Sequence, residues 1–201
     1  MSLEQELKFE YSDFHTLRSR LTACKAQFIH RVFEQNQVFD TANSDLKQAG
    51  KLLRLRQAGQ AVLCLKSEPR NHVPDRDFQV KVWEEAETQV LDVHEMQAIL
   101  EGLGYREVFC YQKVREKWHL GSCVICLDQL PFGRFVEIEG DPQAIWEIAR
   151  VLGLHTWTWT AKSYHELHQE WRVQNQLPHE ESFVFSPEEE ARIRAEMDAK
   201  M

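Results

Sequence analysis

Pairs of like charges separated by a single residue recur along the chain. They are Glu4-x-Glu6, Arg54-x-Arg56, Lys113-x-Arg115 and Glu137-x-Glu139. On a strand, residues two apart share one face and lie about 6 to 7 Å apart, so their like charges repel unless an opposite charge is bound between them. Clustered carboxylates favour hard divalent cations such as Mg²⁺ or Mn²⁺, and clustered Arg and Lys side chains favour phosphate oxygens. Together the pairs indicate a site for a metal-bound polyphosphate.

Alternating apolar and charged residues also suit an ordinary half-buried sheet, whose charged face meets solvent. On periodicity alone this is the commoner arrangement. Here, however, the charges are sorted by strand, with acids on the first and last strands and bases between them, and a solvated face has no reason to sort them. We therefore expect the charged face to line an interior, together with the single charges Lys8, Lys66 and Asp128.

The elements that must position these residues are short strands bounded by turn residues. Strands are expected over residues 3–9, 32–40, 52–56, 62–66, 77–83, 111–118, 124–128 and 135–139. Helices are expected over residues 12–26, with Ser12 as N-cap, then 92–103, 142–151 and 163–173, and from Ser186-Pro187 onward. Strands mixed with segregated helices predict an α+β fold with a large antiparallel sheet. If eight strands curl to closure, the charged face lines a tunnel and the helices cover the outside.

Composition excludes several classes of function. The 201 residues include 24 Lys and Arg and 32 Asp and Glu, a net charge of −8, and so acidic a chain is not expected to bind nucleic acid, because it gains nothing overall from counterion release. No run approaches the roughly 18 apolar residues of a membrane span, and the first residues do not resemble a signal peptide. We expect a cytoplasmic protein, with one catalytic domain over residues 1–172 and a linker and helical appendage over 173–201. A homodimer contact through the last helix is left open.

The charged motifs and several neighbouring segments follow one another in a recognisable order. They are Glu4-Gln5-Glu6-Leu7-Lys8, Phe39-Asp40-Thr41 with Asp45-Leu46, Leu53-Arg54-Leu55-Arg56, Leu63-Cys64-Leu65-Lys66, Lys113-Val114-Arg115, Leu127-Asp128, the run from Gly133 to Glu139, and Lys162-Ser163-Tyr164. Over residues 3 to 170 this order resembles the CYTH superfamily, or triphosphate tunnel metalloenzymes, which includes class IV adenylyl cyclases, thiamine triphosphatases and inorganic triphosphatases. The resemblance implies an eight-stranded antiparallel β-barrel, a tunnel open at both ends, with catalysis inside.

The resemblance also implies roles for individual residues. The metal ligands would be Glu4, Glu6, Asp128, Glu137 and Glu139. The triphosphate would be held by Lys8, Arg54, Arg56, Lys66, Lys113, Arg115 and Lys162, with Glu4, Glu6 and Lys8 as the catalytic group. One stretch departs from the family pattern: where many members carry an Arg-x-Glu-x-Glu-like strand, this chain reads Asp77 to Glu85. If Gln79 and Lys81 point inward there, one carboxylate is lost and one base gained.

Three functions follow from this interpretation. The first is a divalent-metal-dependent phosphohydrolase acting on inorganic, nucleoside or thiamine triphosphate, in which one metal bridges phosphate oxygens and a second activates a water for in-line attack. The alternative is a class IV adenylyl cyclase that converts ATP to cyclic AMP and pyrophosphate in the same tunnel. The third is a non-catalytic binder of polyphosphate or nucleotide, which the departure near Gln79 and Lys81 would favour if it removes a needed metal.

Three other patterns have ordinary structural explanations. Cys123 and Cys126 are spaced like half a zinc or redox site, but no second CxxC follows and residues three apart on a strand point to opposite faces, so free thiols are expected. His165 and His168 are expected on an exposed polar helix face rather than at a metal. The Trp-rich residues 155–159 are expected to form a packed strand rather than a base-stacking site.

Overall fold

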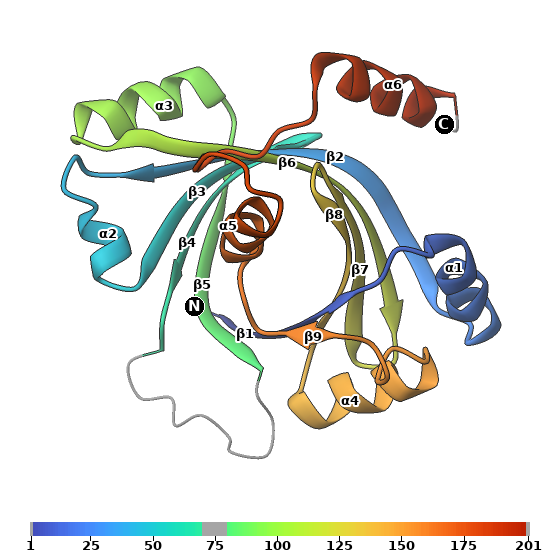
Figure 1. Cartoon of the computed structure of the whole chain (residues 1–201). Coiled ribbons are helices and arrows are strands. Elements are labelled where there is room, and N and C mark those ends of the chain that lie inside the picture. Colours follow the sequence, from blue (N-terminus) through green and yellow to red (C-terminus); the bar gives the residue numbers. More distant parts are fainter. Residues whose placement is uncertain (1, 70–79, 200–201) are drawn as a thin grey trace.

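The chain folds around a closed ring of antiparallel strands, which the computed structural model describes for residues 2–69 and 80–199 (Figure 1). Going round the ring, the strands are β1 (Ser2–Glu10), β5 (Lys81–Val90), β4 (Gln60–Ser67), β3 (Lys51–Ala58), β2 (Gln27–Asp40), β6 (Arg106–Leu120), β7 (Cys123–Leu130) and β8 (Gly133–Glu139). A two-residue strand, β9 (Trp159–Thr160), also pairs with β1. The eight-stranded antiparallel tunnel expected from the sequence is confirmed.

Strand β1 closes the ring because its two halves pair with different neighbours. Its first half pairs with β5, where Glu4 lies opposite Trp83, and its second half pairs with β8, where Lys8 lies opposite Glu137. Residues expected at the start of the fifth strand, Gln79 among them, lie outside the described part of the chain. Within that part the strand begins at Lys81 and continues to Val90, well beyond the expected end at Trp83.

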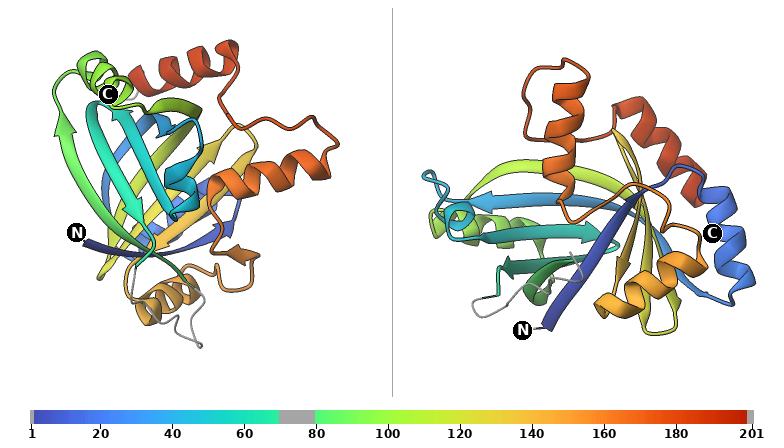
Figure 2. Two further views of the ribbon diagram at one scale, coloured as in Figure 1. Left: turned by 90° about the vertical axis from the view of Figure 1, so that its left-hand side faces the viewer. Right: turned by 60° about the horizontal axis from the view of Figure 1, so that its bottom comes forward.

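Helices lie on the outside of the ring and at one of its ends (Figure 2). They are α1 (Phe14–Ala23), α2 (Asp45–Gln48), α3 (Val93–Gly102), α4 (Pro142–Val151), α5 (Tyr164–Gln174) and α6 (Pro187–Asp198). The largest apolar core lies under α1 and α4, where Leu17 and Ile145 pack on the outer side chains of β1, β7 and β8, such as Leu7, Ile125 and Ile138. None of the described helices is both long and apolar enough to span a membrane.

Polar side chains define most helix starts. Ser163 and Ser186 each accept a hydrogen bond from the backbone N–H of the third helical residue. That residue is a Glu whose side chain accepts from the serine N–H, so both helices begin with a capping box. The expected cap at Ser12 is wrong, because the carboxylate of Asp13 accepts from Thr16 N at 3.0 Å instead. Helix α4 ends as expected before Gly153, whose φ of +69° favours glycine.

Helix α5 stands at one end of the ring and points away from it (Figure 2). Its first residue, Tyr164, is buried and lines the interior of the ring, together with the cap residue Ser163. After α5 the chain returns to the ring, where Phe183 forms backbone hydrogen bonds to β6, and α6 then packs on β2 through Ile193 and Phe33. The start of α5 therefore narrows one mouth of the tunnel.

Candidate active site

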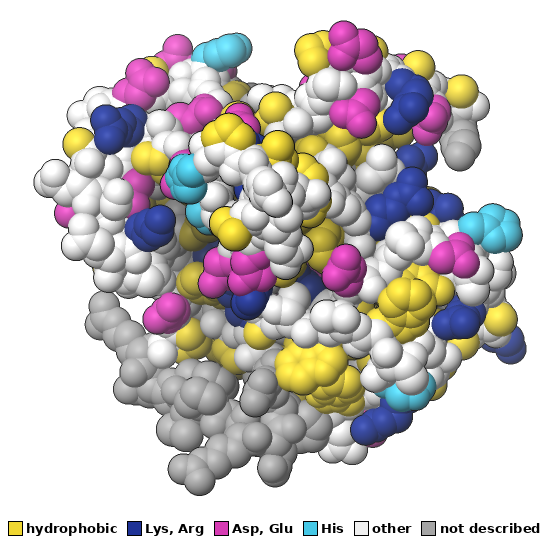
Figure 3. Space-filling view, in the orientation of Figure 1, with side chains coloured by type: hydrophobic (Ala, Val, Ile, Leu, Met, Phe, Trp, Pro, Cys, Tyr) yellow, Lys and Arg dark blue, Asp and Glu magenta, His cyan; other side chains and the backbone are white. Residues whose placement is uncertain are grey.

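The charged faces of the strands meet in one cavity inside the ring, of about 220 Å³. Most of the residues proposed from the sequence line it, namely Glu4, Glu6, Lys8, Arg54, Arg56, Lys66, Lys113, Arg115, Glu137 and Glu139. Seen from the end that α5 occupies, acidic and basic side chains lie next to one another below this helix, near the centre of the face (Figure 3). The expectation of an inward charged face is therefore correct for these positions.

Three carboxylates of β1 and β8 come together in this cavity. One oxygen from each of Glu4, Glu6 and Glu139 lies within 4.8 Å of the others, since Glu6 and Glu139 are opposite each other in the β1–β8 ladder. Burial and the neighbouring Glu137 raise the pKa of Glu6 to about 8, and the same two causes raise the pKa of Glu139. A divalent cation among these oxygens would relieve the repulsion, and an all-carboxylate donor set suits Mg²⁺ or Mn²⁺.

Glu137 differs from this group because it is paired with bases. Its carboxylate contacts Lys8 Nζ at 3.1 Å and also pairs with Arg115. Although burial opposes ionisation, these cations hold the pKa of Glu137 well below its usual range. Lys8 also donates to Glu6 at 2.5 Å. Lys8 thus links the carboxylate cluster of β1 and β8 to the basic part of the cavity.

Asp128, expected as a metal ligand, lies fully buried beneath the cavity lining. It accepts hydrogen bonds from Arg115 Nε at 2.7 Å and Nη2 at 2.5 Å, from Lys113 Nζ at 3.2 Å and from the Tyr164 hydroxyl at 2.8 Å. Glu34 of β2 lies on the other side of Lys113, at 3.6 Å, and Lys113 and Arg115 lower its pKa to about 2 despite its burial. In this geometry the two buried acids hold the bases in place.

The opposite wall, from β3 and β4, is basic. Arg54 donates to the Tyr111 hydroxyl at 3.0 Å, Arg56 pairs with Glu87 at 3.0 Å, and Lys66 pairs with Glu4 and lies 3.4 Å from a Glu85 oxygen. Nε of Arg54 is buried and has no hydrogen-bond partner among the described residues. These cations are held near the cavity by contacts that leave donors available to an anion.

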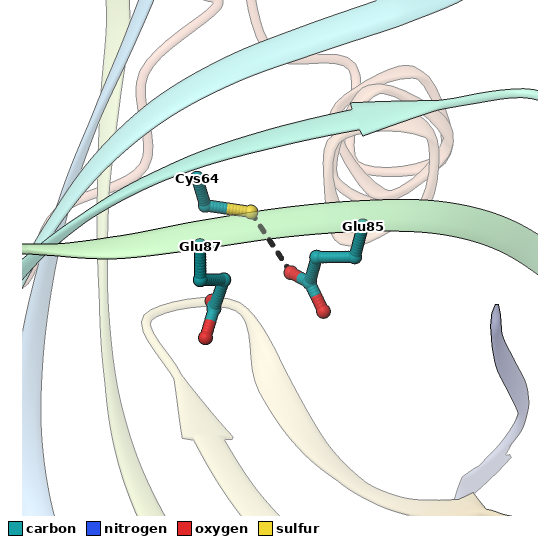
Figure 4. A group of neighbouring side chains, drawn as sticks. All are labelled: Cys64, Glu85 and Glu87. Atoms are coloured by element: carbon teal, nitrogen blue, oxygen red, sulfur yellow. Dashed lines mark hydrogen bonds between the residues drawn. The ribbon is translucent and has the colours of Figure 1, made fainter. Parts of the chain in front are cut away.

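Strand β5 supplies acids that the sequence analysis missed. Lys81, Trp83, Glu85 and Glu87 alternate along it and all line the cavity. Figure 4 shows both glutamates beside Cys64, whose thiol donates to Glu85 at 2.8 Å; burial raises the pKa of this thiol to about 12. Lys81 does face inward, and the same strand brings the carboxylates of Glu85 and Glu87 to the cavity. The sequence shows this alternation, but a strand predicted to end at Trp83 leaves both glutamates out.

The segment around α5 differs from expectation at three positions. Lys162 does not line the cavity; it is about half exposed and pairs with Glu170. Tyr164 takes the inward place, with Lys8 and Lys113 over its ring at 5.2 and 5.4 Å. The expected exposed polar face is wrong for His168, which is 2% exposed because that side of α5 packs on the rings of Phe132 and Phe183. Nothing in a lone tyrosine or histidine signalled these positions.

The cysteine pair of β7 does follow the expectation. Cys123 packs in the outer core, whereas the Cys126 sulfur lies 3.9 Å from a Glu139 oxygen on the inner side, so the two thiols point to opposite faces and both are free. The Trp-rich segment forms only the short strand β9, and Trp157 and Trp159 are partly exposed on the outside of the ring.

A second, wider cavity of about 600 Å³ adjoins the first at the end where α5 begins. The lining residues that the two share are Leu52, Lys81, Trp83, Phe109, Ser163 and His165. Further apolar side chains from β2 and β6 line the wider cavity, along with charged groups at its rim. The charged interior therefore opens into a partly aromatic vestibule.

Comparison with known proteins agrees with this architecture. The CYTH domain model matches residues 2–154. The chain belongs to the CYTH domain family. Among its relatives, a protein of Methanocaldococcus jannaschii named "Putative adenylate cyclase MJ0240" is 26% identical over 152 residues, which cover 75% of this chain and 83% of that protein.

Solved structures share the fold of this CYTH protein. A "putative adenylate cyclase" from Vibrio parahaemolyticus superposes with a TM-score of 0.70 at 22% identity, over 83% of this chain and 98% of that one. The Hippeastrum protein HpAC1, described as a "putative adenylyl cyclase" that "reveals a dominant" triphosphatase activity, has a TM-score of 0.58 at 18% identity, over 89% of this chain and 98% of that one.

Proposed function

We propose that this CYTH protein is a divalent-metal-dependent phosphohydrolase that acts on a triphosphate. The observation that carries the proposal is the meeting of the Glu4, Glu6 and Glu139 carboxylates with Arg and Lys side chains in one enclosed cavity. A purely anionic site would suit a metal alone, and a purely basic one an anion alone. Both together suit a polyphosphate that carries a metal ion.

The residues of the chain divide the work by charge. Arg54, Arg56 and Lys66 bind phosphate oxygens from the β3–β4 wall, and Lys113 and Arg115 from the β6 wall, so that charge spreading over the transferred phosphoryl group is offset. Held by the three carboxylates, Mg²⁺ or Mn²⁺ would supply Lewis-acid polarisation of the phosphate and an acidified water. Arg54 and Lys113 are buried in the wall of the ring, where the lower dielectric strengthens their contacts with an anion.

A second candidate, a class IV adenylyl cyclase, is favoured by the aromatic vestibule at the α5 end. Its 600 Å³ and the rings of Trp83 and Phe109 suit an organic group such as a nucleoside beside a triphosphate in the inner cavity. Hydrolase and cyclase would use the same charged walls. They differ in which phosphorus faces the nucleophile.

Product analysis separates the candidates. The protein is incubated with inorganic triphosphate and, separately, with ATP, each in Mg²⁺ or Mn²⁺, and the products are resolved by ion-exchange chromatography. The hydrolase proposal predicts orthophosphate from at least one substrate. Cyclic AMP with pyrophosphate from ATP would establish the cyclase instead, whereas bound triphosphate without turnover of either substrate would favour the non-catalytic binder.

A further inference from the structure

The segment between α5 and α6 pairs with the part of β6 that has no hydrogen bonds to β7, and it completes the tunnel wall there. Strand β7 pairs with β6 only from Val114 onward, so the first half of β6 has a free edge on that side. Phe183 occupies this edge: its N–H donates to the Cys110 carbonyl at 3.1 Å, and its carbonyl accepts from Gln112 N–H at 3.0 Å. Ser182 Oγ accepts from the N–H of Cys110 at 3.1 Å. The segment thus forms a short parallel bridge to the ring.

The side chain of Phe183 points into the ring rather than toward solvent. It is 4% exposed, lines the inner cavity, and stacks on Tyr111 with ring centroids 5.0 Å apart and planes at 22°. Phe132 meets its ring edge-on, at 5.5 Å. The Phe183 ring is therefore fixed on several sides and limits the positions open to the Tyr111 ring.

Tyr111 in turn holds a guanidinium of the basic wall. Its hydroxyl accepts from Arg54 Nη1 at 3.0 Å, and Arg54 is 8% exposed and lines the same cavity. A hydrogen bond to a charged donor in such a buried place is strongly orienting. Contacts therefore run without a gap from Phe183 through Tyr111 to Arg54.

We propose that Phe183 is a positioning residue, which holds Tyr111, and through it Arg54, in the geometry that binds phosphate. The inference rests on the proposed function only in taking Arg54 as a phosphate-binding residue. It also gives the segment after α5 a part in the site, although the CYTH domain match ends at residue 154.

The test measures binding of inorganic triphosphate to metal-free protein in EDTA by calorimetry, where no turnover occurs. We expect Phe183→Ala to raise the dissociation constant for triphosphate about tenfold, which is comparable to the loss of one charge-assisted hydrogen bond. Phe183→Tyr keeps the aromatic ring, so we expect this variant to bind triphosphate with the wild-type dissociation constant. Ile193→Ala is the matched control, because it removes a buried side chain of the same C-terminal segment that packs on β2 and away from the cavity. Thermal unfolding of every variant checks the fold.

A double-mutant cycle with Tyr111→Phe decides whether Phe183 acts through Tyr111. Without the tyrosine hydroxyl, Phe183→Ala should change the dissociation constant less than threefold. The inference would be overturned if Phe183→Ala changed the dissociation constant equally with and without the Tyr111 hydroxyl. It would also be overturned if Ile193→Ala weakened triphosphate binding as much as Phe183→Ala, or if the wild-type protein did not bind triphosphate. A wild-type protein that binds triphosphate but releases no phosphate contradicts the hydrolase proposal alone.

Discussion

Asp128 illustrates how little a residue type says about its role until its neighbours are known. The alternation places it on the inner face of its strand, and the resemblance to the CYTH superfamily implies a metal ligand at this position. The structure surrounds it with two bases and a phenol instead, and puts none of its surface in the cavity. In this geometry the carboxylate of Asp128 accepts hydrogen bonds from Lys113, Arg115 and Tyr164 and fixes their positions.

Asp128→Asn tests this distinction. The variant leaves Arg115 and Lys113 buried with one anion fewer, so we expect the free energy of unfolding to fall by about 3 kcal/mol and triphosphate to bind more weakly. Affinity for Mn²⁺ alone should change less than threefold. Urea unfolding and Mn²⁺ titration measure the two quantities; a large loss of Mn²⁺ affinity at unchanged stability would make Asp128 a metal ligand after all.

His168 gives a pH prediction. Burial among aromatic rings lowers its pKa to about 4, below the usual 6.5, and its Nδ1 has no partner in the described chain. Among the charged groups around it, Arg172 and His165 lower the pKa further, whereas Glu180 and Glu181 raise it. As pH falls from 6.5 toward 4, His168 takes up a proton in the unfolded state before it does so in the folded state. The free energy of unfolding is therefore highest above pH 6.5 and falls progressively over this range.

The corresponding experiment compares wild type with His168→Phe by urea unfolding at pH 7.5 and pH 5. Between these values the wild type should lose about 2 kcal/mol more stability than the variant, because only the wild type has this group to titrate. Identical losses in both proteins would mean that His168 is not held neutral.

At the scale of elements, the strands could be predicted well because alternation and turn residues both mark them. The eight strands expected for the ring appear within the described residues, whereas the strand expected over residues 155–159 is reduced to the two residues of β9. Alternation alone does not show where a strand ends. Strand β5 continues to Val90, so a strand predicted to end at Trp83 does not include the inward acids Glu85 and Glu87. Which charges pair across the cavity was also beyond the sequence, since pairing depends on register between strands far apart in the chain.

The placement of α5 and of the segment after it could not be foreseen for a different reason. Their inward residues, Tyr164 and Phe183, carry no charge pattern, and aromatic side chains in helices and loops usually serve a core. Only the free edge of β6 explains why Phe183 turns inward. The candidate site was therefore predictable in its charged strands and not in the aromatic groups that complete it.

The two capping boxes provide a matched test at this scale. Ser163→Ala and Ser186→Ala should each lower the free energy of unfolding by about 1 kcal/mol. Only Ser163 lies at the tunnel mouth, where α5 begins with Tyr164, so only Ser163→Ala should also raise KM for triphosphate. Denaturant unfolding and steady-state kinetics check both effects; equal KM changes in the two variants would show that α5 has no special place in the site.

For the whole molecule, the ring gathers the basic side chains of β3, β4 and β6 around its cavity and so sets them apart within a chain whose net charge is −8. This separation lets an acidic protein bind a highly charged anion at one place. Triphosphate with Mg²⁺ should therefore stabilise the folded state, by about 3 kcal/mol at a hundredfold excess over the dissociation constant, or roughly 5 to 10 °C in Tm.

Differential scanning fluorimetry of two arginine variants localises that stabilisation. Arg56→Gln, which removes a charge from the cavity, should lose at least half of the ligand-induced rise in Tm. Arg150→Gln removes the same charge from the exposed surface of α4 and should keep the full rise. If both variants keep it, the anion binds elsewhere than in the ring.

The central claim is that the carboxylates of β1 and β8 hold the metal that the reaction needs, and Glu6→Gln tests it most directly. Because burial and Glu137 make ionisation of Glu6 unfavourable, the variant should be at least as stable as wild type at pH 7. Glu10→Gln makes the same change at the exposed end of the same strand.

The measurement is Mg²⁺- or Mn²⁺-dependent phosphate release from triphosphate by the three proteins, alongside their Tm. We predict that Glu6→Gln loses at least a hundredfold in rate with Tm unchanged or raised, while Glu10→Gln matches wild type. Wild-type rates in a folded Glu6→Gln protein would contradict the account.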